Sequence, residues 1–135
     1  MSYWLVKSEP ETWAWEEHVK EGTAEWDGVR NYQACNNMKA MEVGDKAFFY
    51  HSGKDREIVG LIEVVKTYYP DPTDESGRFG MVDFKALETL PKPVSLAEIK
   101  ADPRLQEIAL VRQSRLSVMP IDEVSWNIIS QMGGL

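Results

Sequence analysis

Alternating hydrophobic and polar positions along the chain predict several short strands. The clearest case is residues 81–87, where Val82, Phe84 and Ala86 share one side of an extended segment, as in a strand with one buried face. Residues 70–77, rich in Pro, Asp and Gly, are predicted to form an exposed loop before it. The other predicted strands are residues 3–7, 46–51, 58–68 and 115–118. We expect most of these strands to lie in one sheet.

Capping residues and apolar spacing predict four helices. Ser95 and Glu98 have the spacing of a capping box, and Gly133 follows the apolar positions of the last segment. Pro10 precedes the first helix, and Asn31 can cap the second. The predicted helices cover residues 11–20, 31 to about 41, 95 to about 101, and 122–132. Because strands and helices alternate irregularly, the chain is predicted to be an α+β domain around a small curved sheet.

Length and composition fit one globular domain. The chain has 135 residues, of which 43% are hydrophobic, so it can bury a core but has little room for a second domain. No apolar run approaches a membrane span, and the first residues enter a predicted strand without a basic leader or signal segment. With Cys35 as the single cysteine, no internal disulfide can form. We therefore expect one domain over residues 1–135, in the cytoplasm, without membrane contact.

Charge limits the kind of nucleic-acid contact that the chain can make. A net charge of −7 argues against a general nucleic-acid coat. The charge is uneven, however, because residues 9–27 hold seven acids and one lysine, whereas residues 104–120 hold three arginines and one acid. An acidic chain can still present one basic contact face. A solvated mixture of charges explains the composition equally well.

Few residues have the spacing of a catalytic or metal site. Only His18 and His51 are available as imidazole ligands, and no Cys-x-x-Cys is present, so we expect no metal and no cofactor. Cys35, His51 and an Asp could form a nucleophilic triad, but no local signature supports it. We therefore predict a binding module and no enzyme activity. A small hydrolase or nuclease that uses Cys35 and His51 is the alternative.

The aromatic residues suggest a different chemistry. The chain has five Trp and five Tyr, and several adjoin polar turn residues, such as Trp26 before Asp27 and Gly28. Flat rings beside fixed hydrogen-bonding groups suit a pocket for an extruded or unpaired base. Packing in the core is the competing interpretation for each ring.

Four stretches, residues 4–10, 26–34, 44–52 and 111–118, together resemble the EVE domain family in order and spacing. The resemblance implies a small PUA-like open β-barrel with flanking helices and kinship with YTH domains, which read a methylated base in RNA through an aromatic cage. It also implies a module that recognises a modified or extruded base, with a modified pyrimidine in DNA or RNA as the favoured target. A module for small ligands or protein partners, using the same cleft, is a further alternative.

The resemblance also implies roles for individual residues. Ser8 would face the base edge, Trp26 would stack on the base, Arg30 would order the rim, and Asn31 would bond the base or brace the turn. Relatives commonly carry Arg where this chain has Cys35. The base-binding pocket is assigned to Lys7, Ser8, Glu9, Trp26, Val29, Arg30, Asn31, Tyr50, His51 and Ser52, and contacts with phosphate or sugar to Arg112 and Arg115.

Overall fold

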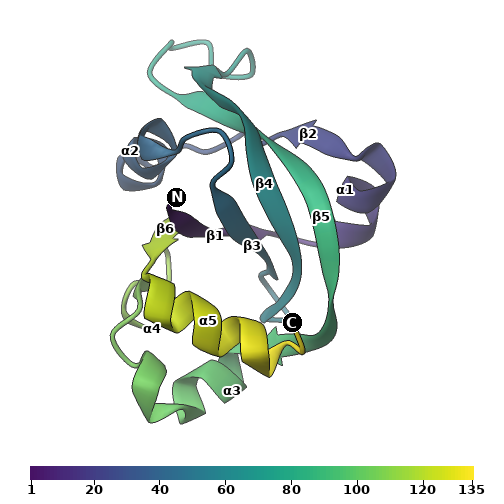
Figure 1. Ribbon diagram of the computed structural model, residues 1–135. Helices are drawn as coiled ribbons and strands as arrows, with labels where there is room; N and C mark the ends of the chain where they lie inside the picture. The colour runs from purple at the N-terminus through teal and green to yellow at the C-terminus, as the bar shows by residue number, and fades with distance from the viewer.

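One six-stranded sheet forms the centre of the protein in the computed structural model, which describes residues 1–135 (Figure 1). The strand order is β2-β5-β4-β3-β1-β6; β1 and β3 run parallel, and all other neighbours run antiparallel. The outer strands β2 and β6 do not pair with each other, so the sheet is open and no closed barrel forms. The strands are β1 (Tyr3–Ser8), β2 (Thr23–Glu25), β3 (Lys46–His51), β4 (Glu57–Pro70), β5 (Gly80–Ser95) and β6 (Val118–Ile121).

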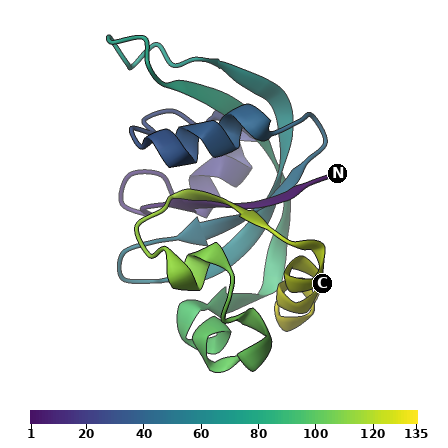
Figure 2. The same cartoon turned by 90° about the vertical axis from the view of Figure 1, so that its left-hand side faces the viewer.

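Five α-helices and one short 3-10 helix flank the sheet. Helices α3, α4 and α5 gather at one end of the strands, whereas α2 lies beside the other half (Figures 1 and 2). The side chains of Asn31, Ser95 and Asp122 accept hydrogen bonds at the starts of α2, α3 and α5. The helices are α1 (Trp15–Glu21), α2 (Tyr32–Ala40), α3 (Leu96–Ala101), η1 (Pro103–Leu105), α4 (Ala109–Arg112) and α5 (Glu123–Met132). The α+β class is therefore confirmed.

Several element boundaries differ from the sequence prediction, and the strand predicted for residues 81–87 continues as β5 to Ser95. The first helix starts at Trp15 and not at residue 11, because the backbone N–H groups of Thr12 and Trp13 both donate to the carbonyl of Glu9 and close a turn there. The predicted strand 115–118 is mostly a turn, in which Leu116 donates to the carbonyl of Gln113, and β6 begins only at its end.

The two faces of β3 pack against different groups, because successive side chains of a strand point to opposite faces. Phe48 stacks on Trp126 of α5 with ring centroids 3.8 Å apart, and Trp126 stacks on Tyr3. Phe49 contacts Trp15 and Trp26 on the other face. We call these groups the Phe48 cluster (Tyr3, Phe48, Trp126) and the Phe49 cluster (Trp15, His18, Trp26, Phe49, Phe84).

Gly60 in β4 leaves room for the Phe49 cluster. A Cβ atom at this position would lie 2.3 Å from the nearest atom of the Trp15 indole. The glycine pairs with Phe49 across the sheet. A side chain here would therefore push the indole out of its place above the sheet.

Candidate nucleic-acid interface

A cleft with a volume of about 720 Å³ lies at the end of β1. One wall comes from β1 and the turn after it, and the other from β2 and its connection to α2. This volume lies within the range of small-molecule and cofactor sites. Of the ten predicted pocket residues, six line it: Lys7, Ser8, Glu9, Trp26, Val29 and Arg30.

Trp26 forms part of the cleft while belonging to the core. Its ring meets Phe49 and Phe84 edge-on at 5.4 and 5.5 Å between centroids, and only 7% of the residue is exposed. Its backbone N–H donates to the carbonyl of Val82 at 2.7 Å. Little of the ring is therefore accessible to a ligand, because aromatic neighbours cover most of it.

Trp13 is a second aromatic wall that the sequence analysis missed. The residue is half-buried and lines the cleft opposite the β2–α2 connection. Its carbonyl accepts a hydrogen bond from the Ser8 hydroxyl at 2.5 Å, and its indole N–H donates to Nδ1 of His18 at 3.1 Å. Trp13 adjoins polar turn residues, the same signal that selected Trp26, but the predicted helix start at residue 11 hid it.

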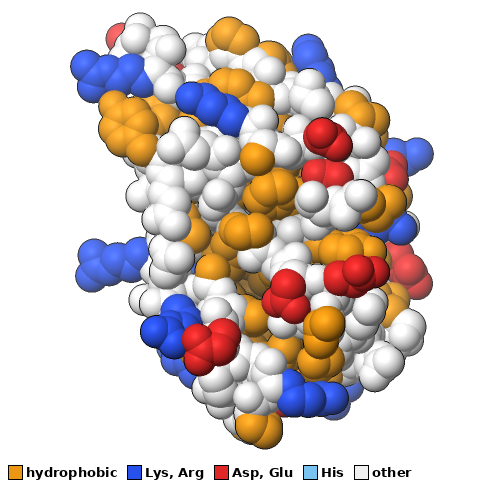
Figure 3. Space-filling model, turned by 60° about the vertical axis from the view of Figure 1, so that its left-hand side comes forward, with side chains coloured by type: hydrophobic (Ala, Val, Ile, Leu, Met, Phe, Trp, Pro, Cys, Tyr) orange, Lys and Arg blue, Asp and Glu red, His pale blue; other side chains and the backbone are white.

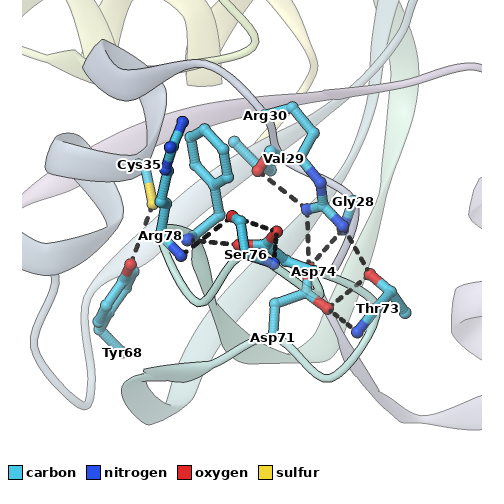
Figure 4. A network of polar contacts seen from close by, with 11 residues as sticks. Gly28, Val29, Arg30, Cys35, Tyr68, Asp71, Thr73, Asp74, Ser76 and Arg78 are labelled. Carbon is cyan, nitrogen blue, oxygen red and sulfur yellow. Dashed lines mark hydrogen bonds and ion pairs between the residues drawn. The ribbon is translucent and has the colours of Figure 1, made fainter.

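Arg30 is held in place at the rim by the tip of the β4–β5 hairpin (Figure 4). Its guanidinium lies 3.1 Å from the Asp71 carboxylate and donates to the Thr73 hydroxyl at 2.9 Å. Asp71 also accepts from the backbone N–H of Gly28. Burial alone would raise the pKa of Asp71, but hydrogen bonds from Thr73, Gly28 and Arg30 outweigh it and lower the pKa to about 2. The role expected for Arg30, ordering the rim, agrees with this network.

Tyr50, His51 and Ser52 do not line the cleft, contrary to the assignment made from the resemblance. Tyr50 is buried. Nε2 of His51 accepts from the backbone N–H of Trp15 at 2.9 Å, and Ser52 donates its N–H to the carbonyl of Ser8. These residues support the β1 wall of the cleft from the neighbouring strand, because the end of β3 lies next to the end of β1 in the sheet.

Asn31 also lies outside the main cleft. Its side-chain oxygen accepts from the N–H of Ala34 at 2.9 Å and caps α2, which corresponds to the bracing role among its two expected roles. It lines a second cavity of about 330 Å³ together with Arg112 and Arg115. The main and second cavities are linked by Lys7, whose ammonium donates to the carbonyl of Ser114 at 2.9 Å. Burial lowers the pKa of Lys7.

The charges around the two cavities differ. The main cleft is lined by two cationic side chains, Lys7 and Arg30, and four acidic ones: Glu9, Glu21, Glu25 and Asp27. The second cavity has Arg112, paired with Glu107 at 2.8 Å, and Arg115, which forms no ion pair. On the face drawn in Figure 3, Lys and Arg side chains occur singly among acidic and neutral groups. A phosphate is therefore repelled at the β2 wall and attracted on the side of Arg115.

Cys35 and His51, the pair considered for a hydrolase, have separate partners. Cys35 is buried, and its Sγ lies 3.1 Å from the Tyr68 hydroxyl. His51 bonds to Trp15 through Nε2, and its Nδ1 lies 3.4 Å from Asp55. No hydrogen bond joins the thiol to the imidazole. No cluster of three potential metal ligands is found, and no helix is both long and apolar enough to cross a membrane.

The protein is an α+β domain with an open mixed sheet, and a cleft lined by two tryptophans lies at the end of its first strand. The family model described as the EVE domain matches residues 2–132, and the chain belongs to the EVE domain family. Thymocyte nuclear protein 1 from Homo sapiens is 33% identical over 167 residues, which cover 95% of this chain and 72% of that protein. Its name refers to the nucleus, so it lends no support to the cytoplasmic location expected from the sequence.

Solved structures give the same relationship. Protein Atu2648 from Agrobacterium tumefaciens is 47% identical with a TM-score of 0.98, covering 100% of this chain and 94% of that chain. Human THYN1 protein, solved in complex with DNA containing 5-methylcytosine, is 32% identical with a TM-score of 0.94, covering 98% of each chain. The YTH domain of Zygosaccharomyces rouxii MRB1 protein, solved with N6-methyladenosine RNA, is 15% identical with a TM-score of 0.61 over 99% of this chain and 85% of that chain, which shows a related fold.

Proposed function

We propose that this protein is a nucleic-acid-binding module that recognises a methylated cytosine, turned out of its strand, in the cleft between β1 and the β2–α2 connection. The observation that carries the proposal is the cleft lined by Trp13 and Trp26. The similarity of the chain to human THYN1 protein, which was solved in complex with DNA containing 5-methylcytosine, supports it. Moving a base out of its stack costs a few kcal/mol of free energy. Stacking of the base on an aromatic side chain contributes about 1–3 kcal/mol of binding free energy in compensation.

The acidic residues of the cleft favour a base that donates hydrogen bonds. Glu9, Glu21, Glu25 and Asp27 offer carboxylate oxygens, which only accept when ionised. Cytosine carries an amino group at N4 that donates to such oxygens, whereas thymine presents the O4 acceptor there. The same charges that repel phosphate therefore support selection of cytosine over thymine.

Phosphate contacts are proposed on the side of the second cavity. Arg112 and Arg115 line that cavity, and Lys7 lies between it and the main cleft. A strand that crosses from one cavity to the other would place one base between the tryptophans and its neighbouring phosphates beside the arginines. The net charge of −7 limits the footprint to a few phosphates.

The proposed mechanism makes and breaks no covalent bond. The separate partners of Cys35 and His51 give a hydrolytic triad no geometric support. The experiment compares oligonucleotides that differ only by one 5-methyl group on cytosine, as DNA and as RNA. One fully buried methyl group contributes about 0.8 kcal/mol, so the methylated DNA should bind about fourfold more tightly.

Each alternative function has a different outcome in the same experiment. Equal binding of the two oligonucleotides contradicts recognition of the methyl group. Binding of free 5-methylcytidine or of a peptide, with no gain from the oligonucleotide, favours a small-ligand or protein-interaction module. Cleavage of the oligonucleotide that disappears in Cys35→Ser favours the hydrolase. Tighter binding of the RNA pair moves the proposal from DNA to RNA.

A further inference from the structure

The Trp13 indole is held by a histidine that does not itself line the cleft. His18 lies on α1 and is fully buried. Its Nδ1 accepts the hydrogen bond from the Trp13 indole at 3.1 Å, with ring centroids 5.9 Å apart. Its Nε2 lies 2.9 Å from the backbone carbonyl of Phe84 in β5. His18 thus connects one wall of the cleft to the centre of the sheet.

Only one protonation state of His18 satisfies both partners. The carbonyl of Phe84 can only accept, so Nε2 must carry the proton, and the indole N–H of Trp13 can only donate, so Nδ1 must be free of one. The neutral imidazole protonated at Nε2 meets both conditions. In the imidazolium, both ring nitrogens donate, and the proton on Nδ1 would face the indole N–H. Protonation therefore removes the bond that holds Trp13.

We propose that His18 is a positioning residue that sets the Trp13 ring for stacking on the bound base, so that the cleft binds well only while His18 is neutral. The inference rests on the proposed function for the identity of the ligand, a flat methylated base. It assigns a role to a residue that contacts no ligand. It also predicts a pH dependence of base binding that His18→Gln should reduce.

No charged group in contact with His18 could stabilise its protonated form. The turn before α1, α1 itself, the β2–α2 connection, β3 and β5 present Trp13, Trp15, Trp26, Phe49 and the carbonyl of Phe84, respectively. On its own helix, Glu16, Glu17 and Lys20 are exposed, and Glu17 caps the N–H of Ala14. The other imidazole, His51, bonds to the Trp15 backbone.

The direction of titration follows from this environment. Burial lowers the pKa of His18 from its ordinary value near 6.5, and the bond to the Phe84 carbonyl only partly offsets it. His18 is therefore neutral at pH 7 to 8 and gains its proton only below about pH 6.5. Base affinity should fall in that acidic range and be constant above it.

The first test follows Trp13 without any nucleic acid. The indole N–H signal of Trp13 in a ¹H–¹⁵N NMR spectrum, assigned by its loss in Trp13→Phe, should shift as the pH is lowered from 7.5 to the acid limit at which the protein stays folded. The same signal should not titrate in His18→Gln. The glutamine amide both accepts and donates but carries no titrating proton. An indole signal that does not move in the wild type, or that titrates equally in His18→Gln, overturns the positioning role.

The second test measures binding of the methylated DNA oligonucleotide over the same pH range. His18→Leu, which keeps an apolar filling but no hydrogen bond, should weaken binding by roughly fivefold or more at pH 7.5, comparable to losing one base stack. His18→Gln should recover part of this loss and bind with a flatter pH profile than the wild type. His18→Leu with wild-type affinity contradicts the inference.

The two tests separate the inference from the proposed function. If no oligonucleotide binds, the proposed function fails, and the indole titration still decides whether His18 positions Trp13. If His18→Leu does not fold, as shown by its circular dichroism, the comparison of wild type with His18→Gln decides alone. A pH profile that is identical in these two proteins overturns the proposal.

Discussion

The Phe48 cluster and the Phe49 cluster lie on opposite faces of one strand and differ in how their rings are held. In the Phe48 cluster, the rings are nearly parallel, at 19° between Phe48 and Trp126, and no hydrogen bond joins them. In the Phe49 cluster, Trp26 meets Phe49 at 86°, and a buried imidazole bonds to two partners. In the Phe48 cluster the rings only stack on one another, whereas the Phe49 cluster combines rings with hydrogen bonds.

The difference shows how one strand can serve both stability and recognition. Rings that only stack on one another bury apolar area, but no hydrogen bond between them fixes their orientation toward a ligand. The hydrogen bond from its indole to His18 gives Trp13 a set direction in the cleft wall, and edge-on contacts with Phe49 and Phe84 hold the Trp26 ring in the same wall lining. Because an unpaired buried polar atom is costly, this arrangement works only if every partner is present. No buried side-chain nitrogen or oxygen in the protein lacks a partner.

The largest expected effect separates the clusters by truncating one ring in each. Phe48→Ala and Trp26→Ala should each destabilise the fold by about 3–5 kcal/mol, because both rings are deeply buried. Urea denaturation measures this loss. Under conditions in which both variants remain folded, Phe48→Ala should keep the preference for the methylated oligonucleotide, whereas Trp26→Ala should lose it. Loss of the preference in both variants contradicts the division of roles.

Truncation of Trp13 should have a smaller effect, because this residue contributes to the cleft more than to the core. Trp13→Ala should weaken binding of the methylated oligonucleotide by about 1–3 kcal/mol, the contribution of one base stack. Fluorescence anisotropy with a labelled oligonucleotide measures the affinity. Val124→Ala is a suitable control, because Val124 is exposed on α5, outside the residues that line the cleft. An unchanged affinity in Trp13→Ala would remove this ring from the binding site.

Much of the fold could be predicted because its signals are local. The capping side chains of Asn31, Ser95 and Asp122 lie next to the helices that they start. Strand β2 was missed, since its three residues are ordered by pairing with β5, about sixty positions later in the chain. The strand order depends on such long-range pairs, and periodicity alone does not contain them.

The site was predicted less completely than the fold, for a physical reason. Residues close in sequence, such as Tyr50 and Ser52, reach a strand end together, but which side chains face the cleft depends on the neighbouring strand. Trp13 and His18 are joined by a hydrogen bond that forms only because the chain turns before Trp15. A helix from residue 11 would have placed them differently. From the sequence, His18 was considered only as a possible metal ligand, and its role beside Trp13 was not predicted.

Of the two clusters, only the Phe49 cluster should make the free energy of unfolding depend on pH, and this effect should be smaller than the effects of ring truncation. His18 has a lowered pKa in the folded state because of burial, so the unfolded state takes up its proton first as the pH falls. Stability is therefore fully present above about pH 6.5 and decreases below it, by at most about 1.4 kcal/mol per pH unit. Urea midpoints between pH 7.5 and 5.5 measure this. His18→Gln should lack the decrease, whereas Trp126→Phe, in the other cluster, should retain the wild-type profile.

The smallest expected effect concerns the charges outside both clusters. Arg115 is exposed and forms no ion pair, whereas Arg112 is paired with Glu107 at 2.8 Å. Arg115 is therefore the freer of the two to neutralise a phosphate. With two or three phosphates neutralised, log affinity should fall with log salt at a slope of about −1.5 to −3. Arg115→Ala should make that slope shallower by about one and weaken methylated and unmethylated oligonucleotides alike.

Ser8→Ala is the matched comparison for this measurement. It removes the hydrogen bond to the carbonyl of Trp13 and adds no charge, so it should reduce the preference for the methylated base and leave the salt slope intact. A salt titration of the wild type and both variants, each with the methylated and unmethylated oligonucleotide, gives both quantities at once. A slope steeper than about −3 in the wild type would mean a longer phosphate footprint than this acidic surface allows. Loss of base preference alone in Arg115→Ala would place the guanidinium at the base, because a phosphate contact carries no information about methylation.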